Sequence, residues 1–155
     1  MTSANDLYSK LKPDVAAIAN SLFELSETLI SKTGNFFPHG AVLTDGAEVK
    51  LVAAAPPGGT DLTNSIEVLP VLHDGLRTMA SEVSCKAIGI AENVTVTPEG
   101  QRPTAAIKVL FEHRCGLCVA LYLPFKKKLF GGYSFGQPFT VAANPEVNAW
   151  PVGDA

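Results

Sequence analysis

Residues 40–54 read GAVLTDGAEVKLVAA, two short apolar runs on either side of an Asp45-Gly46 pair. Valine, leucine and threonine suit a pleated, half-buried strand, and an Asp-Gly pair between two such runs is the strongest short signal for a β-hairpin. Pro56-Pro57-Gly58-Gly59 then ends the strand pattern, because proline lacks the N–H that a sheet ladder needs. The stretch therefore predicts an antiparallel hairpin at the start of a β-sheet.

Apolar residues ahead of this hairpin recur at spacings of four and three, which places them on one side of a helix. They are Leu11, Val15, Ile18, Leu22, Leu25 and Leu29. Pro13 suits the first turn, where its missing N–H costs little, and Gly34 suits the left-handed position that ends a helix. The pattern predicts a helix from near Pro13 to Gly34 that packs across a sheet and leaves some apolar surface for a partner.

A second apolar stripe at helical spacing follows the hairpin. It consists of Ile66, Leu69, Leu72, Leu76, Met79 and Val83. Pro70 is compatible with a first turn but would kink a helix that began at Asn64. We therefore expect the regular part of this helix from about Leu69 onward.

Three β-prone segments complete the pattern. They span residues 87–97, 104–113 and 117–125. Turn residues at 98–100 and 114–116 separate them, so the segments predict an antiparallel meander. The glycine- and proline-containing stretch 126–150 predicts one short strand near 139–142 before an irregular tail.

The whole chain is expected to be one α+β domain, with a core over about residues 10–142 and a tail at 143–155. Its two amphipathic helices would pack on a five- to six-stranded antiparallel sheet in the order α-β-β-α-β-β-β. In this order the chain resembles the profilin-like group, which includes roadblock and longin domains. The resemblance covers roughly residues 10–125 and implies a scaffold for dimerisation and partner binding. The departure is the tail, which stands where the group has a final helix.

The chain has 155 residues, of which 46% are hydrophobic and 17% charged, a composition typical of one folded domain. Its formal net charge of −3 gives no strong field that would attract nucleic acid. No apolar run approaches the roughly 20 residues that cross a bilayer, and the N-terminus lacks a signal-peptide pattern. Three cysteines, an odd number, suit a reducing compartment. We therefore expect a cytoplasmic protein with no cofactor, and with neither nucleic acid nor membrane as a partner.

Cys115-Gly116-Leu117-Cys118 is the motif whose spacing resembles a redox or metal site. In thioredoxin-like sites such a pair opens a helix, whose dipole lowers the thiol pKa, whereas a β-prone run follows here. A zinc site needs four ligands, and the nominal set is Cys85, His113, Cys115 and Cys118. Ordinary packing of the cysteines is the favoured interpretation, so no metal is predicted, and thiol-redox or zinc chemistry remains an alternative.

Two titratable residues suggest a ligand pocket between the sheet and the helices. His73 lies beside the second apolar stripe, and Glu92 interrupts the apolar face of its strand. A β-bulge is the favoured explanation for Glu92, with deliberate burial as the alternative. Lys108 and Glu112 share one face of the next strand and are expected to form a solvated or paired surface.

Residues 125–139 read FKKKLFGGYSFGQPF, with five aromatic residues among fifteen. Such rings either cover their own sheet or meet another chain, because aromatic residues are the usual anchors of interfaces. The candidate contact residues are Phe125, Lys127, Phe130, Tyr133, Phe135 and Phe139. The segment also has the composition of a single-strand nucleic-acid platform, but three lysines do not outweigh a net acidic molecule. The same lysines are too few to hold a membrane surface alone.

The favoured hypothesis is a non-enzymatic protein-interaction module that associates with itself as a homodimer, with another protein as the alternative partner. Its contact surface would be the first helix, a sheet edge or the aromatic segment. No catalytic residue is predicted, because the sequence contains no nucleophile elbow, no HExxH, no phosphate loop and no GxGxxG. A small-molecule-binding or sensory domain with a pocket near His73 and Glu92 is the second hypothesis.

Overall fold

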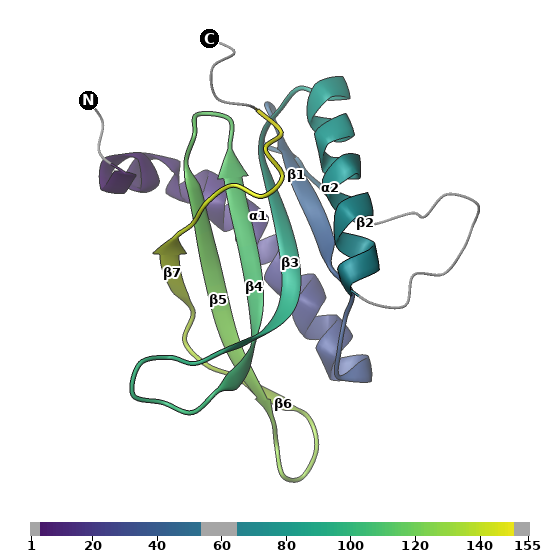
Figure 1. Cartoon of the computed structure of the whole chain (residues 1–155), viewed down its shortest axis with the longest axis vertical. Helices are drawn as coiled ribbons and strands as arrows, with labels where there is room; N and C mark the ends of the chain where they lie inside the picture. Colours follow the sequence, from purple (N-terminus) through teal and green to yellow (C-terminus); the bar gives the residue numbers. More distant parts are fainter. Residues whose placement is uncertain (1–3, 54–64, 151–155) are drawn as a thin grey trace, which may run out of the picture.

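The computed structural model describes residues 4–53 and 65–150, which form two helices and seven strands (Figure 1). The helices are α1 (Ala4–Thr33) and α2 (Ser65–Glu82). The strands are β1 (His39–Thr44), β2 (Val49–Ala53), β3 (Cys85–Val96), β4 (Thr104–His113), β5 (Cys118–Lys127), β6 (Tyr133–Phe135) and β7 (Phe139–Ala142). The predicted α+β class and order α-β-β-α-β-β-β are confirmed. The short strand β6, which the sequence analysis missed, and β7 bring the sheet to seven strands.

The sheet is antiparallel, in the order β2-β1-β3-β4-β5-β6. Strand β7 also pairs with β5, along residues 119–122, whereas β6 pairs with residues 125–127. Strands β3 and β4 pair from Ala87 opposite His113 to Val96 opposite Thr104 without a shift in register. The bulge expected at Glu92 is therefore wrong. Glu92 is instead a half-buried carboxylate in a regular strand, opposite Lys108 in the register.

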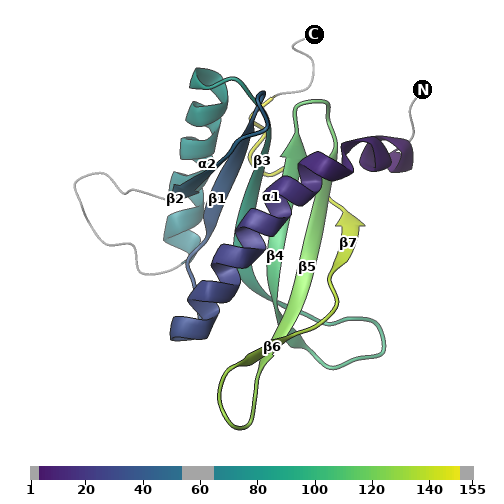
Figure 2. The same cartoon turned by 180° about the vertical axis from the view of Figure 1, so that it is seen from behind.

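The two helices cover opposite faces of the sheet, as Figures 1 and 2 show from the two sides. A Cβ added to Gly89 of β3 would lie 2.4 Å from Cγ2 of Ile18, so α1 rests directly on the strand backbone. A Cβ added to Gly40 of β1 would lie 3.2 Å from Cδ1 of Leu76 in α2. Because Gly40 pairs with Ile90, the neighbour of Gly89, these two close approaches are on opposite faces.

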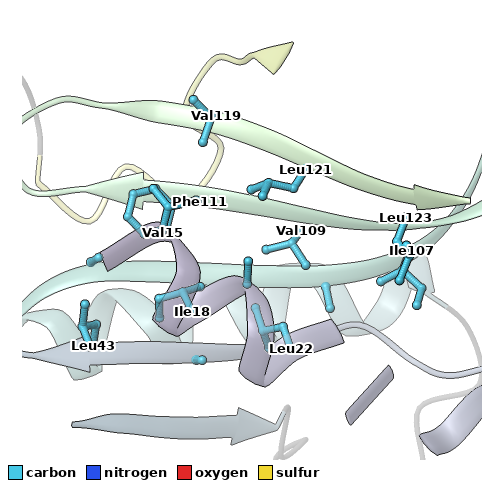
Figure 3. Close-up of a cluster of buried hydrophobic side chains, with 14 of the residues drawn as sticks. Val15, Ile18, Leu22, Leu43, Ile107, Val109, Phe111, Val119, Leu121 and Leu123 are labelled. Carbon is cyan, nitrogen blue, oxygen red and sulfur yellow. The ribbon is translucent and has the colours of Figure 1, made fainter. Parts of the chain in front are cut away.

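The main core lies between α1 and the sheet. Figure 3 shows Val15, Ile18 and Leu22 of α1 directed toward Ile107, Val109 and Phe111 of β4 and toward Leu121 of β5. The middle of the helix stripe and the alternate residues of β4 from Ile107 to Phe111 are buried, Phe111 completely. Apolar residues that recur every 3.6 positions in the helix thus pack against apolar residues that recur every second position in the strand.

Both helices include a proline that was expected to lie in their first turn. In α1, Pro13 lies inside the helix, and the first turns bend away from the rest (Figure 2). Proline removes one backbone hydrogen bond and bends a helix without always ending it. Leu7, Tyr8 and Leu11 of the bent part pack against the main core, which stabilises these turns. In α2, Pro70 likewise lies within a helix described from Ser65.

Candidate functional site

The face of the sheet opposite α1 is only half covered by a helix. Helix α2 contacts β1, β2 and β3. In Figure 1 the yellow segment after β7 crosses the upper ends of β5 and β4 and runs toward α2. Val147 of this segment is buried with Leu72 and Leu76 of α2, and Trp150 packs against the same cluster. The rest of this face, which extends from Glu92 of β3 over β4 and β5 to β7, we call the open half-face.

A buried carboxylate holds the C-terminal segment in place. Glu112 Oε2 accepts hydrogen bonds from the backbone N–H groups of Glu146 and Val147 at 3.0 and 2.9 Å, and Oε1 accepts one from Asn148 at 3.0 Å. Arg77 of α2 donates from Nε to the carbonyl of Val147 at 2.7 Å. The solvated or paired surface expected for Lys108 and Glu112 is therefore wrong for Glu112, because this residue is 5% exposed and its carboxylate accepts from three backbone N–H groups.

One row of side chains crosses the open half-face from β3 to β7. Register places Glu92 opposite Lys108, Lys108 opposite Tyr122 and Tyr122 opposite Phe139. Burial raises the pKa of Glu92, Lys108 opposes this shift and Glu146 adds to it. The Tyr122 and Phe139 rings stack with their centres 5.2 Å apart. The row therefore changes from charged at β3 to aromatic at the β7 edge.

The aromatic segment divides into a part that folds onto the core and a part that does not. Phe125 is buried, and the rings of Tyr133 and Phe135 lie 6.2 and 6.0 Å from it, each half-buried. Phe130, by contrast, is 96% exposed and its neighbour Leu129 is 90% exposed. Three of the candidate contact residues are thus core or boundary residues, and the tip of the β5–β6 hairpin is the part left uncovered.

Strand β7 presents a second exposed apolar feature. All four of its residues are exposed, including Phe139 at 38% and Val141 at 44%. Phe139 was predicted from the sequence as a contact residue, whereas Val141 and Leu129 were not. Alternation along the predicted strand could have paired Val141 with Phe139, and the Gly131-Gly132 turn signal could have placed Leu129 beside Phe130 at a hairpin tip.

The nominal zinc ligands are distributed over both faces of the sheet. His113 faces α1, where its Nε2 lies 3.1 Å from Oδ2 of Asp14, and its Nδ1 accepts the backbone N–H of Cys115. Cys118 is opposite Glu112 in the register and lies on the other face. Within residues 4–53 and 65–150, no three His, Cys, Asp or Glu side chains are grouped so as to hold a metal ion.

The three cysteines are free, and the two that are not exposed, Cys85 and Cys118, lie in surroundings that oppose thiolate formation. Burial, with a smaller contribution from Glu112, raises the pKa of the Cys118 thiol to about 12. Burial also raises the pKa of Cys85, which lies in the cluster under α2. Since the thiolate is the nucleophile, burial disfavours the reactive form of both side chains.

The two residues of the predicted ligand pocket lie in different surroundings. His73 is half-buried on α2, and its Nε2 has no hydrogen-bond partner in the described part of the chain. Glu92 belongs to the row on the open half-face. A shallow hollow of about 290 Å³ at the root of the β5–β6 hairpin includes neither residue. Its lining consists of Thr104, Pro124, Phe125, Lys126, Ser134, Phe135 and Gly136.

Neither α1 nor α2 has the unbroken apolar length that a bilayer crossing requires. Comparison of the chain with models of protein families, with curated proteins and with solved structures gives no match. The resemblance to the profilin-like group therefore remains one of element order.

Proposed function

We propose that this protein is a non-enzymatic, cytoplasmic interaction module that forms a homodimer through the free edge of β7. The observation that carries the proposal is the exposure of every residue of this edge strand, with Phe139 and Val141 among them. The outer side of β7 pairs with no strand in the described residues. The unpaired backbone groups of such an edge can bind a strand from another chain. In a dimer with two-fold symmetry, β7 of one copy would pair with β7 of the other.

The remaining surfaces support this choice by elimination. The apolar stripe of α1 is largely used within the chain, because Val15, Ile18 and Leu22 are buried against the sheet. The opposite sheet edge, β2, carries an exposed lysine, Lys50, and charged residues on an edge oppose pairing with another chain. Strand β7 has the sequence Phe-Thr-Val-Ala and carries no charge.

Light scattering during size-exclusion chromatography at micromolar concentration tests the proposal. The wild type should have twice the chain mass. Val141→Lys should shift it to the monomer, because each chain would bring a new positive charge into a short strand pair that is otherwise uncharged. Leu51→Lys is the matched control, since Leu51 is 55% exposed on the opposite edge strand, and this variant should stay dimeric. A wild type that is monomeric, or a dimer lost in Leu51→Lys instead, would refute the β7 contact.

A further inference from the structure

The tip of the β5–β6 hairpin combines two exposed apolar side chains with three lysines. Leu129 and Phe130 are 90% and 96% exposed, and Lys126, Lys127 and Lys128 directly precede them and are exposed as well. We propose that this tip docks the protein on an anionic lipid surface, with Leu129 and Phe130 inserted among the lipids and the lysines at the level of the headgroups.

The tip is a defined turn that holds the apolar pair outward. The backbone N–H of Lys128 donates to the carbonyl of Gly132 at 2.9 Å. Gly131 and Gly132 both have positive φ, at 98° and 76°, a conformation that glycine adopts without strain. In Figure 1 the hairpin extends below the rest of the sheet, on the side away from the first turns of α1. A flat surface can therefore reach Leu129 and Phe130 before it meets the body of the protein.

The stretch of chain that contains the tip carries charges of one sign only. Between Glu112 and Glu146 there is no acidic residue, whereas Arg114 and the three lysines of the hairpin are basic. The molecule as a whole has a formal net charge of −3, and all of its 15 acidic residues lie outside residues 113–145. An anionic surface would attract the basic hairpin and repel the net acidic rest of the protein. These forces would orient the protein with its tip toward the lipids.

Neither half of the tip would suffice alone. Three lysines are attracted only weakly to anionic lipid, so the lysines alone do not predict a membrane partner. The structure adds the apolar pair, which has no cover in the described residues and which a lipid layer can bury without a shaped pocket. Lysine side chains can extend along the surface so that their charges stay in water. The cytoplasmic leaflet is the natural anionic surface for a cytoplasmic protein.

Sedimentation with vesicles tests the proposal on the full chain. The probes are vesicles of phosphatidylcholine alone and of phosphatidylcholine with phosphatidylserine, and the wild type should bind the second and lose binding as salt is raised. The double variant Leu129→Ser with Phe130→Ser should weaken binding at least about tenfold. Changing the three lysines to glutamine should weaken it by about fivefold per lysine.

A control variant separates this tip from other exposed apolar residues. Leu51→Ser removes an exposed leucine from the β2 edge and should bind as the wild type does. All these side chains are in solvent, so circular dichroism should show every variant folded. Equal binding to both vesicles, or tip variants that bind as well as the wild type, would overturn the proposal. Binding to acidic proteins but to neither vesicle would overturn it too. The β7 contact is independent of the tip, so Val141→Lys must still discriminate between the vesicles.

Discussion

The two faces of the sheet are closed in different ways. One long helix covers the first face, and the strand residues beneath it are apolar except near the ends of their strands. On the second face α2 covers only part of the sheet, and an irregular segment fixed by Glu112 covers the upper ends of β4 and β5. A helix satisfies its own backbone hydrogen bonds and needs only apolar contacts, whereas an irregular segment brings free N–H groups that need an acceptor. On β4, Phe111 packs in the core under α1, and its neighbour Glu112 accepts hydrogen bonds from the C-terminal segment on the other face.

The largest expected effect comes from the helix-covered face. Phe111→Ala should lower the free energy of unfolding by about 3 to 5 kcal/mol, because it leaves a cavity in a fully buried aromatic position. Urea unfolding measures the change. If the loss were below that of the Glu112 variant described next, the α1 core would not be the dominant source of stability.

Glu112→Gln should have a smaller and more local effect, of about 2 to 3 kcal/mol. The amide keeps one oxygen but turns an N–H₂ group toward backbone donors, so the hydrogen bonds to Glu146, Val147 and Asn148 cannot all survive. Hydrogen exchange should show lost protection in these three amides while β3 and β4 stay protected. Equal loss of protection throughout the sheet would show that the second face is not closed as a separate unit.

The smallest effect concerns His39, a buried polar residue on the α1 face. Burial lowers its pKa, although hydrogen bonds to the carbonyls of Phe37 and Leu22 act in the opposite direction. Its Nε2 lies 3.2 Å from the hydroxyl of Ser26. Since the folded pKa is below the unfolded value of 6.5, the unfolded chain binds more protons as the pH falls through 6.5. The stability contributed by neutral His39 should therefore be complete above this pH and decline below it.

Unfolding curves at pH 7.5 and 5.5 for the wild type and His39→Gln test this sign. On acidification, the free energy of unfolding should fall more in the wild type than in the variant, and chemical denaturation can resolve the difference. Burial also lowers the pKa of His113, but that residue is present in both proteins and its contribution cancels. An identical pH dependence in the two proteins would show that His39 does not titrate as its burial implies.

Much of the fold was predictable from the sequence because the deciding signals were local. The hairpin of β1 and β2, the meander from β3 to β5 and the strand β7 follow from alternation and turn residues. Gly34 has φ of 80° at the end of α1, as predicted. The turn after β1, however, has Ala47 rather than Gly46 in the left-handed conformation, at φ of 66°. A hydrogen bond from the Ala47 N–H to the carbonyl of Thr44 stabilises this turn.

The candidate site was predictable only in part. The aromatic segment could be named from its composition, but which of its rings are covered depends on where the hairpin reverses. Phe125 and Phe135 face the core, while Phe130 lies past the last paired residues, Lys127 and Tyr133. Likewise nothing in the local sequence of β4 distinguishes a solvated Glu112 from one that binds a segment 34 residues later.

The sequence by itself determined the α+β class, the order of its elements and the faces on which they bury apolar residues, because periodicity and turn chemistry act over a few residues. Only the tertiary structure decided that Pro13 bends α1 instead of starting it, that Glu112 binds the C-terminal segment, and that Leu129 and Phe130 remain in solvent. Each of these depends on which distant groups compete for the same space or the same hydrogen bond, and that competition exists only once the chain has folded.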